Sequence, residues 1–530
     1  MKIKILAFAS VLLLVGCGDF FDINDDPNNP TRAELNTILP YTQATIFGAF
    51  GFGTAGVTDI LAVYNHQTVQ RGNHDDYKIQ SGEFQVQTPW DQLYTVALPD
   101  LNAIIERREE APIYTGIAKL LKAYMFSGIV DLWGDMPYSE AGDPVNFKFP
   151  KFDDDMAIYA AMFPLIDEAI ADLGAGGTKP AADDLIYGGD VAKWVKFANS
   201  LKLNLYNRVR LTTLYDAGAV NALLAQNNFM SSAADDFELD YTTTITPENR
   251  NPAYVREYAQ NSPAYYISPY FFLLMNGEQA CQNSLMVGIQ DPRIPYYFYN
   301  QLAPGETAQN PESYRNGEFL SIWFGSFDRD PFEGFDQNIS QTIVGLYPVG
   351  GAYDDGSGVN ANQNMGTKGS GPQRLLTAAD IDFVRAELAL TMSTTDDARA
   401  LLLSGMNKAF AEVNIAAAAG GGPALDAAEI TSYTDAVLAL YDAANATGKL
   451  EIIMTQKWIQ AFGSGLDSYN DIRRTGFPEV CDPAQDLNEF STQTNPYPVS
   501  LPYNLNDLTT NGNAPPQRDQ YSDRVFWDIN

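Results

Sequence analysis

Helical periodicity in two parts of the chain, separated by an irregular stretch, is the feature that most constrains the fold. In residues 191–210 apolar side chains recur every three or four positions, from Val191 and Trp194 to Val209. This spacing places the apolar side chains on one face and the lysines on the other, so it predicts an amphipathic helix. Residues 153–173 show the same pattern, and the aspartates at their start suit a helix N-terminus.

Further helical segments come in pairs that short turns join. They are expected at about 92–110, 116–131, 377–392, 396–415, 426–446 and 449–462. Pro164 should kink or restart the helix at 153–173, because proline lacks the N–H that a helix interior needs. Paired helices predict a mainly α fold of helix-turn-helix repeats stacked as a solenoid, at about 90–230 and 374–478, although no strict sequence period accompanies them.

The stretch between the two helical parts, residues 235–372, is rich in Pro, Gly, Asn and Asp and shows no sustained helical period. It is also rich in aromatic residues, because residues 241–360 hold 21 of the 64 aromatic side chains. Irregular backbone needs packing too, so most of these rings are interpreted as core. The remainder are candidates for a ligand-binding surface.

The N-terminus has the pattern of a signal peptide. Lys2 and Lys4 precede an apolar run over residues 5–15, which is shorter than the ~20 residues that a membrane-spanning helix needs. The run ends in Leu-Val-Gly-Cys, which resembles the bacterial lipobox, so residues 1–16 are expected to be removed and Cys17 to carry a lipid. Two or three acyl chains, palmitate among them, would anchor the protein firmly. An ordinary secretory signal beside an incidental cysteine is the alternative.

The acidic excess excludes whole classes of partner. The chain has 66 acidic and 33 basic side chains, and its formal net charge is −33. Nucleic acid binding draws its affinity from Lys and Arg that displace counterions, so no nucleic acid partner is expected. An anionic membrane surface would repel the chain as well, so membrane attachment must come from the lipid. Cys281 and Cys481 remain after lipidation, and their surroundings leave open whether they pair.

Motifs for catalysis, metal binding and nucleotide binding are missing from the sequence. The chain has only two histidines, His66 and His74, and no GxSxG motif accompanies them, so polar loop residues are the favoured interpretation. Residues 22–33 begin like a calcium loop, but Pro27 and Ala33 stand where an EF-hand needs Gly and Glu. The chain also lacks GxxxxGKS/T, GxGxxG and CxxC. No metal and no cofactor is therefore expected.

Several blocks of the sequence resemble the SusD/RagB family of nutrient-binding outer-membrane lipoproteins. The first is CGDFFDINDDPNNPT, which begins at Cys17, and the second is LLKAYMFSGIVDLWGDMPYSEA at 120–141. Further similar blocks lie at 184–210, 374–390, 456–478 and 524–528. Residues 495–513 depart from the family pattern, since many relatives carry a basic stretch there. The large residues inside the blocks are interpreted as packing residues: Trp133, Trp194, Trp458, Arg473 and Arg474.

The resemblance implies one SusD-like domain over residues 17–530, with tetratricopeptide-like repeats and a large irregular insertion. It implies a lipid-anchored protein on the outer face of the outer membrane, which captures oligosaccharides and passes them as a lid to a SusC-like TonB-dependent transporter. Members of this family bind ligands and do not catalyse, so no enzyme activity is implied. Three alternatives remain open: an oligopeptide ligand, a surface-anchored glycan-cleaving enzyme whose two carboxylates leave no motif, and a structural docking protein.

Candidate ligand-binding residues come from the chemistry of sugars, because the resemblance transfers none to particular positions. A sugar offers C–H patches and a rim of hydroxyls, so its receptor needs aromatic faces beside planar polar groups. Residues 66–77 and 323–353 have this mixture, and we expect them to converge on one surface that faces the transporter. The candidates are His66, Arg71, Asn73, Asp75, Tyr77, Trp323, Phe324, Tyr347 and Tyr353.

Overall fold

Helices dominate the computed structural model of the chain, and its strands are short. The structure describes residues 33–53, 55–70, 77–79, 82–260, 263–307, 314–325, 340–481 and 495–529. The expected signal peptide and Cys17 lie outside these residues, as do Arg71, Asn73 and Asp75. In the described ranges, no helix is both long enough and apolar enough to cross a membrane.

The N-terminal helices pack on one another in sequence order. They are α2 (Leu35–Phe50), α3 (Val57–Tyr64), α4 (Phe84–Asp91), the π-helical η1 (Gln92–Ala97), α5 (Leu98–Ile105), α6 (Pro112–Trp133), α7 (Asp155–Gly174), α8 (Val191–Arg208) and α9 (Ala217–Gln226). Helix α6 packs against α7, and α7 packs against α8. The predicted helices at 92–110, 116–131, 153–173 and 191–210 are all present, with ends shifted by a few residues.

Helix α8 shows why the periodic segments become helices. Asp190 caps its start, because the Asp190 carboxylate accepts hydrogen bonds from the backbone N–H groups of Ala192 and Lys193 at 2.9 and 3.2 Å. The predicted apolar stripe faces the core: Trp194 and Leu201 are buried, and Val191 is half-buried. Helix α7, by contrast, runs without interruption through Pro164. That proline is exposed, so water can satisfy the carbonyl group that its missing N–H leaves unpaired.

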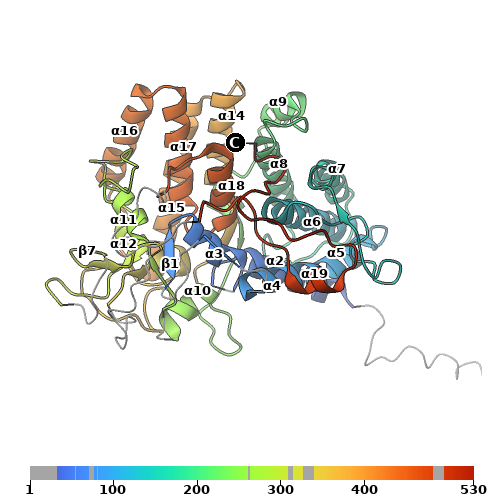
Figure 1. Cartoon of the computed structure of the whole chain (residues 1–530), viewed down its shortest axis with the longest axis horizontal. Helices are drawn as coiled ribbons and strands as arrows, with labels where there is room; N and C mark the ends of the chain where they lie inside the picture. The colour runs from blue at the N-terminus through green and yellow to red at the C-terminus, as the bar shows by residue number, and fades with distance from the viewer. Residues whose placement is uncertain are drawn as a thin grey trace, which may run out of the picture.

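The C-terminal helices form a second group. They are α14 (Ala378–Thr391), α15 (Ala398–Gly420), α16 (Ala427–Ala443), α17 (Ala446–Gln460) and α18 (Gly465–Thr475). The short helix α19 (Leu505–Thr510) lies apart from them, beside the N-terminal helices α4 and α5 (Figure 1). Helices α14 to α17 stand side by side, with α6 to α9 on the other side of the molecule (Figure 1). Helix α14 also contacts α8 and so joins the two groups. The paired arrangement confirms the predicted mainly α fold.

The irregular region lies beside and below the second helical group, around α10 to α12 and β7 (Figure 1). Its helices are short: η2 (Ala233–Asp235), α10 (Pro252–Tyr254), the π-helical η3 (Val255–Ala259), α11 (Pro269–Met275), α12 (Ile294–Tyr297) and α13 (Leu346–Val349). All described strands pair in antiparallel twos: β1 (Thr68–Gln70) with β5 (Tyr265–Ile267), β2 (Met136–Pro137) with β3 (Phe152–Asp153), β4 (Phe237–Leu239) with β10 (Gln373–Leu376), β6 (Phe298–Tyr299) with β9 (Ile343–Val344), and β7 (Tyr314–Asn316) with β8 (Phe319–Ser321).

Tyrosine hydroxyls supply hydrogen-bond donors to this irregular backbone. Tyr258 donates to the carbonyl oxygen of Val344 at 2.7 Å. The same kind of bond joins Tyr254 to Met365, Tyr270 to Glu479, Tyr296 to Pro423 and Tyr299 to Val359. Buried carbonyl groups need partners, and irregular backbone lacks the repeating bonds that satisfy them in a helix. The tyrosine rings therefore fill the core of the region, and their hydroxyls satisfy its backbone carbonyl groups.

Buried ion pairs tie the helices of the scaffold together. Arg208 of α8 bonds both Asp131 of α6 and Asp467 of α18. Arg474 of α18 bonds Glu387 of α14, and all of these side chains are at most 10% exposed. The large residues of the family-like blocks are likewise buried, as expected of packing residues: Trp133, Trp194, Trp458, Arg473 and Arg474. These pairs thus fix the two helical groups relative to each other.

Candidate functional site

Short strands bring the two predicted ligand-binding stretches together. His66 lies just before β1, and Trp323 and Phe324 lie just after β8. The hydroxyl of Ser321, the last residue of β8, donates to the carbonyl oxygen of Ile267 at 2.6 Å, and Ile267 pairs with Thr68 of β1. Residues about 250 positions apart in the sequence therefore meet at one place in the fold.

Phe324 is the point of contact between these stretches. Its ring centroid lies 4.4 Å from that of His66 and 4.5 Å from that of Tyr77. Tyr77 in turn contacts Tyr497, at 5.3 Å between ring centroids. We call these four rings the Phe324 cluster. Phe324 and Tyr497 each pack against both hydrophobic cores of the molecule, so the cluster lies where the N-terminal helices meet the irregular region.

His66 acts as a structural support of this cluster. Complete burial lowers the pKa of His66 to about 3, so its imidazole is neutral near neutral pH. Its Nε2 atom is hydrogen-bonded to the Tyr77 hydroxyl. Both residues have left-handed backbone conformations, with φ of 57° at His66 and 40° at Tyr77. Such conformations are unfavourable for a bulky residue such as tyrosine and persist only where the surroundings enforce them.

Helix α17 and the C-terminal segment hold His66 in place from both sides. The Trp458 indole N–H donates to the carbonyl oxygen of Asn65 at 3.1 Å, and the Gln67 amide donates to that of Trp458 at 2.7 Å. The Tyr497 hydroxyl donates to the Asn65 side chain at 3.1 Å. The residues on both sides of His66 are therefore bonded to the scaffold, and the cluster is preorganised.

A disulfide bond closes the same region. Cys281 and Cys481 are bonded, with their Cα atoms 5.4 Å apart, which settles the pairing that the sequence left open. Two residues before Cys481, the carbonyl oxygen of Glu479 accepts a hydrogen bond from Tyr270 at 2.6 Å. The Tyr270 ring lies 5.6 Å from that of His66. Tyr270 thus connects the segment beside the disulfide bond to His66 of the Phe324 cluster.

The partly exposed aromatic faces of the site belong to the β7–β8 hairpin and the residues after it. Trp323 and Tyr314 are partly buried, with edge-to-face rings 5.0 Å apart. Beside them, the Asn316 amide donates to the Glu278 carboxylate at 2.9 Å. Rings with amide and carboxylate groups at their edges can cover the C–H face of a sugar and bond its hydroxyls. Sequence reasoning missed Tyr314, although the Asn316-Gly317 dipeptide is a hairpin signal that places it near Trp323.

The other predicted site residues lie elsewhere or point inward. His66, Tyr77 and Tyr347 are buried, at 0%, 0% and 2% exposure, so their rings contact protein side chains in this structure. Tyr347 stacks on Tyr297 at 4.9 Å and bonds Glu412, away from the Phe324 cluster. Tyr353 is partly buried and packs on Tyr296. Ligand contact by any of these residues stays a prediction.

One group of carboxylates has the spacing of a metal site in the described part of the chain. The ligand atoms of Asp135, Asp154 and Asp155 lie within 4.8 Å of one another. Each carboxylate already accepts a backbone hydrogen bond: Asp135 from Asp155, Asp154 from Ala157, and Asp155 from Phe526. Burial raises the pKa of Asp155 to about 6. These bonds fix the start of α7.

Solved structures of low sequence identity share this fold. A SusD homologue from Bacteroides fragilis NCTC 9343 is 18% identical and has a TM-score of 0.68, over 94% of this chain and 99% of that chain. A chitin-binding SusD homologue from Flavobacterium johnsoniae is 18% identical and has a TM-score of 0.66, over 93% and 99% of the two chains. At such identities the likeness shows the fold alone. No curated protein has a sequence that matches this chain.

The family model with the description "Starch-binding associating with outer membrane" matches residues 27–502. That range covers both helical groups, the irregular region and every described residue of the Phe324 cluster. The match agrees with the sequence blocks and with the shared fold. The chain therefore belongs to the SusD-like family of binding proteins that associate with the outer membrane.

Proposed function

We propose that this chain is a non-catalytic lipoprotein of the cell surface, which captures oligosaccharides and passes them to a SusC-like TonB-dependent transporter. The observation that carries the proposal is the partly exposed face of Trp323, the residue next to Phe324 of the preorganised cluster. Tyr314 lies at the edge of Trp323, and the hydrogen bond of Asn316 with Glu278 is two residues from Tyr314. Aromatic faces next to planar polar groups suit a sugar ring. The family description supports the same ligand class.

A binding role without catalysis fits the chemistry of the site. The imidazole of His66 has a pKa of about 3, so it is a poor general base near neutral pH. It is also buried and bonded to Tyr77, away from any substrate. A protein that hands its ligand on needs a rigid, shaped surface that releases the ligand again, and preorganisation by the scaffold supplies that rigidity.

Titration calorimetry with a panel of oligosaccharides tests the binding function. Trp323→Ala should weaken the binding of the best ligand tenfold or more. An aromatic contact contributes about 0.5–1.5 kcal/mol beyond its buried area, and each ~1.4 kcal/mol is about tenfold in affinity. Tyr41→Ala, which removes an exposed ring on α2, is the matched control and should bind as the wild type does. Full affinity of Trp323→Ala at an unchanged melting temperature would place the site elsewhere.

The same panel separates binding from cleavage and from peptide capture. After overnight incubation with the pure protein, chain lengths of the oligosaccharides should be unchanged. Shortening of the oligosaccharides by an activity that co-purifies with the protein would favour a surface-anchored glycan-cleaving enzyme. Heat of binding with an oligopeptide mixture, and with no saccharide, would favour an oligopeptide-binding member of the family.

The lipid anchor and the transporter have separate tests. Cys17→Ser should release the protein from the membrane fraction, because the described residues contain no helix that could hold it there. Retention of this variant in cells without the transporter would contradict the anchor. The wild type should purify together with its barrel after mild detergent extraction, and a protein that runs alone would favour a docking or enzyme role.

A further inference from the structure

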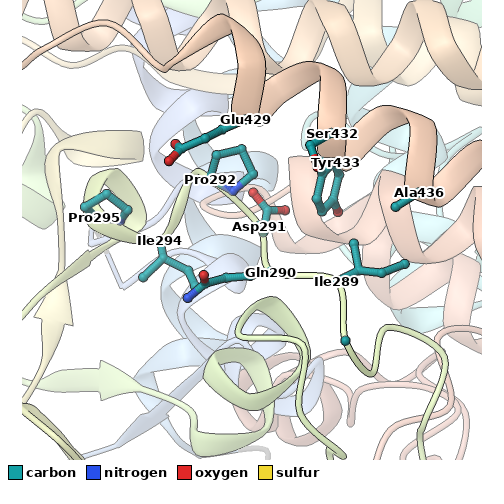
Figure 2. Close-up of a pocket in the computed structure, with 11 residues that line it drawn as sticks. Ile289, Gln290, Asp291, Pro292, Ile294, Pro295, Glu429, Ser432, Tyr433 and Ala436 are labelled. Atoms are coloured by element: carbon teal, nitrogen blue, oxygen red, sulfur yellow. The ribbon is translucent and has the colours of Figure 1, made fainter.

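A second cleft lies apart from the Phe324 cluster, between residues 288–295 and helix α16. Its volume is about 460 Å³, within the ~300–1,000 Å³ typical of small-molecule sites. Figure 2 shows Glu429, Ser432 and Tyr433 projecting from α16 on one side, with Asp291 facing them from the loop. The wall residues come from two segments that are remote in sequence, so the tertiary fold creates the cleft.

The loop wall of the cleft is held in place by the end of α11. The N–H of Gly288 donates to the carbonyl oxygen of Gly277 at 2.8 Å, and that of Asp291 donates to Met275 at 2.8 Å. The Gln290 amide donates to the side chain of Asn276 at 2.8 Å. A wall fixed in this way loses little conformational entropy when a ligand binds.

The cleft carries a net negative charge from Glu429. Its one buried carboxylate, that of Asp291, is already neutralised. Asp291 accepts two hydrogen bonds from the Arg293 guanidinium, at 2.9 and 2.5 Å, and both residues are 1% exposed. Arg293 also lies 4.8 Å over the Phe410 ring, so it is not available to a ligand. Glu429 is exposed, and its carboxylate has no hydrogen-bond or ion-pair partner among residues that the structure describes. Lys, Arg and His are absent from the lining that the described chain forms.

Tyr353 stands next in sequence to a residue that bonds the wall of the cleft. The N–H of Asp354 donates to the carbonyl oxygen of Pro295, a lining residue, at 2.8 Å. The Tyr353 ring packs on that of Tyr296, at 4.9 Å between centroids. This predicted ligand-binding residue therefore lies near the Pro295 end of the second cleft, outside the lining that the described residues form, and not in the Phe324 cluster.

We infer that this cleft is a second saccharide-binding site, which takes a neutral or amine-bearing sugar unit and rejects uronic acids. Ile294 and the rings of Pro292 and Pro295 offer apolar contact to C–H groups. Glu429, Ser432 and Gln290 offer hydrogen-bond partners to hydroxyls. An unpaired carboxylate with no cation beside it repels a second carboxylate and attracts an amine. The inference rests on the proposed function only for the choice of a saccharide as ligand.

Calorimetry of the full mature chain in detergent tests the inference, with cellotetraose, a glucosamine tetramer and tetragalacturonate as probes. Ser432→Trp fills the cleft from an exposed helix position, and Thr431→Trp adds the same bulk to an exposed neighbouring position as the control. We expect the wild type to bind two molecules of cellotetraose or of the glucosamine tetramer per chain. Ser432→Trp should leave one, and Thr431→Trp should leave two. Trp323→Ala should weaken one of the two tenfold or more.

The outcomes separate this inference from the proposed function. One bound molecule per chain, held more weakly by Trp323→Ala and unchanged in Ser432→Trp, would overturn the second site and leave the proposed function standing. No heat with these probes or with any saccharide of the panel would contradict both. Glu429→Gln tests the charge argument, since it should raise the affinity for tetragalacturonate at least threefold and lower that for the glucosamine tetramer. Equal affinity of the wild type for these two probes would overturn the stated selectivity.

Discussion

The helical scaffold and the irregular region satisfy their buried polar groups in different ways. In the scaffold the backbone bonds itself, so the buried polar side chains are free to form ion pairs between helices, such as Arg474 with Glu387. In the irregular region the backbone lacks that repeat, and tyrosine hydroxyls such as that of Tyr258 bond its carbonyl groups. The comparison teaches that a tyrosine-rich loop region can be rigid, which a binding surface requires.

Breaking a buried ion pair of the scaffold should have the largest effect on stability. Arg474→Ala leaves Glu387 and Asp471 buried with one partner fewer, and we expect a loss of about 3–5 kcal/mol in the free energy of unfolding. Urea denaturation measures it. Arg399→Ala is the matched control, because Arg399 bonds Asp442 with the same fork geometry at 2.7 and 2.9 Å on an exposed surface. Equal midpoints for the two variants would show that buried pairs do not stabilise the scaffold.

Removing the disulfide bond should have the next largest effect, and in the irregular region. Cys281 and Cys481 are 200 positions apart, so the bond greatly restricts the unfolded chain. Replacing both by serine should cost about 2–4 kcal/mol. Urea denaturation of the wild type with and without a reducing agent provides the control, since the reduced wild type should match the double variant. A reduced wild type as stable as the oxidised protein would contradict this account.

The helices could be predicted from the sequence where an apolar stripe marks them. Val191, Trp194 and Val209 predict α8 because their spacing has the period of a helix. Helix α18 escaped prediction because its buried face is charged: Asp467, Asp471, Arg473 and Arg474 are buried in ionic and hydrogen-bonded contacts that a search for apolar periodicity does not register. Pairing between distant charges is decided by the tertiary fold alone.

The candidate site could be predicted only in part, for a related reason. An aromatic residue in an irregular stretch can face a ligand or the core, and no local pattern separates these cases. The sequence placed His66 and Trp323 in one site, and the structure brings Phe324 against His66. It could not show that Trp458 and Tyr497 enclose the residues around His66, or that Tyr353 packs on Tyr296 away from that cluster, because these contacts join segments far apart in the sequence.

A change of pH should act on the scaffold through a buried carboxyl group of α14. Burial raises the pKa of Asp380, at the start of α14, from 3.8 to about 6. Because the folded-state pKa is the higher one, this carboxyl stabilises the fold fully below about pH 4, and the contribution is lost as the pH rises through about 6. Asp380→Asn should reduce the fall in unfolding free energy between pH 4 and 7 by about 1–3 kcal/mol.

Melting temperatures across that pH range, compared with those of the exposed-site control Asp435→Asn, check this prediction. The control should retain the pH dependence of the wild type. If Asp380→Asn retains it as well, burial of this carboxyl does not couple pH to the stability of the scaffold.

Loss of one tyrosine hydroxyl should have the smallest effect. Tyr258→Phe removes the donor to Val344 and the acceptor for the N–H of Ala352, and we expect a loss of about 1–2 kcal/mol. The ring and its packing on Tyr254 remain, so thermal unfolding reports the hydroxyl alone. Tyr41→Phe, on the exposed face of α2, should leave the melting temperature unchanged. If the melting temperature of Tyr258→Phe equals that of the wild type, this tyrosine hydroxyl does not stabilise the irregular region.

Hydrogen exchange with and without bound saccharide tests most directly whether the irregular region binds the ligand while the helices support it. With the oligosaccharide that gives the largest heat of binding, amide exchange should slow in peptides that cover residues 314–325, and also in those that cover 288–297 if the second cleft is filled. Peptides of α8 and α17 should exchange at the same rate in both states. Protection confined to those helices would contradict the account.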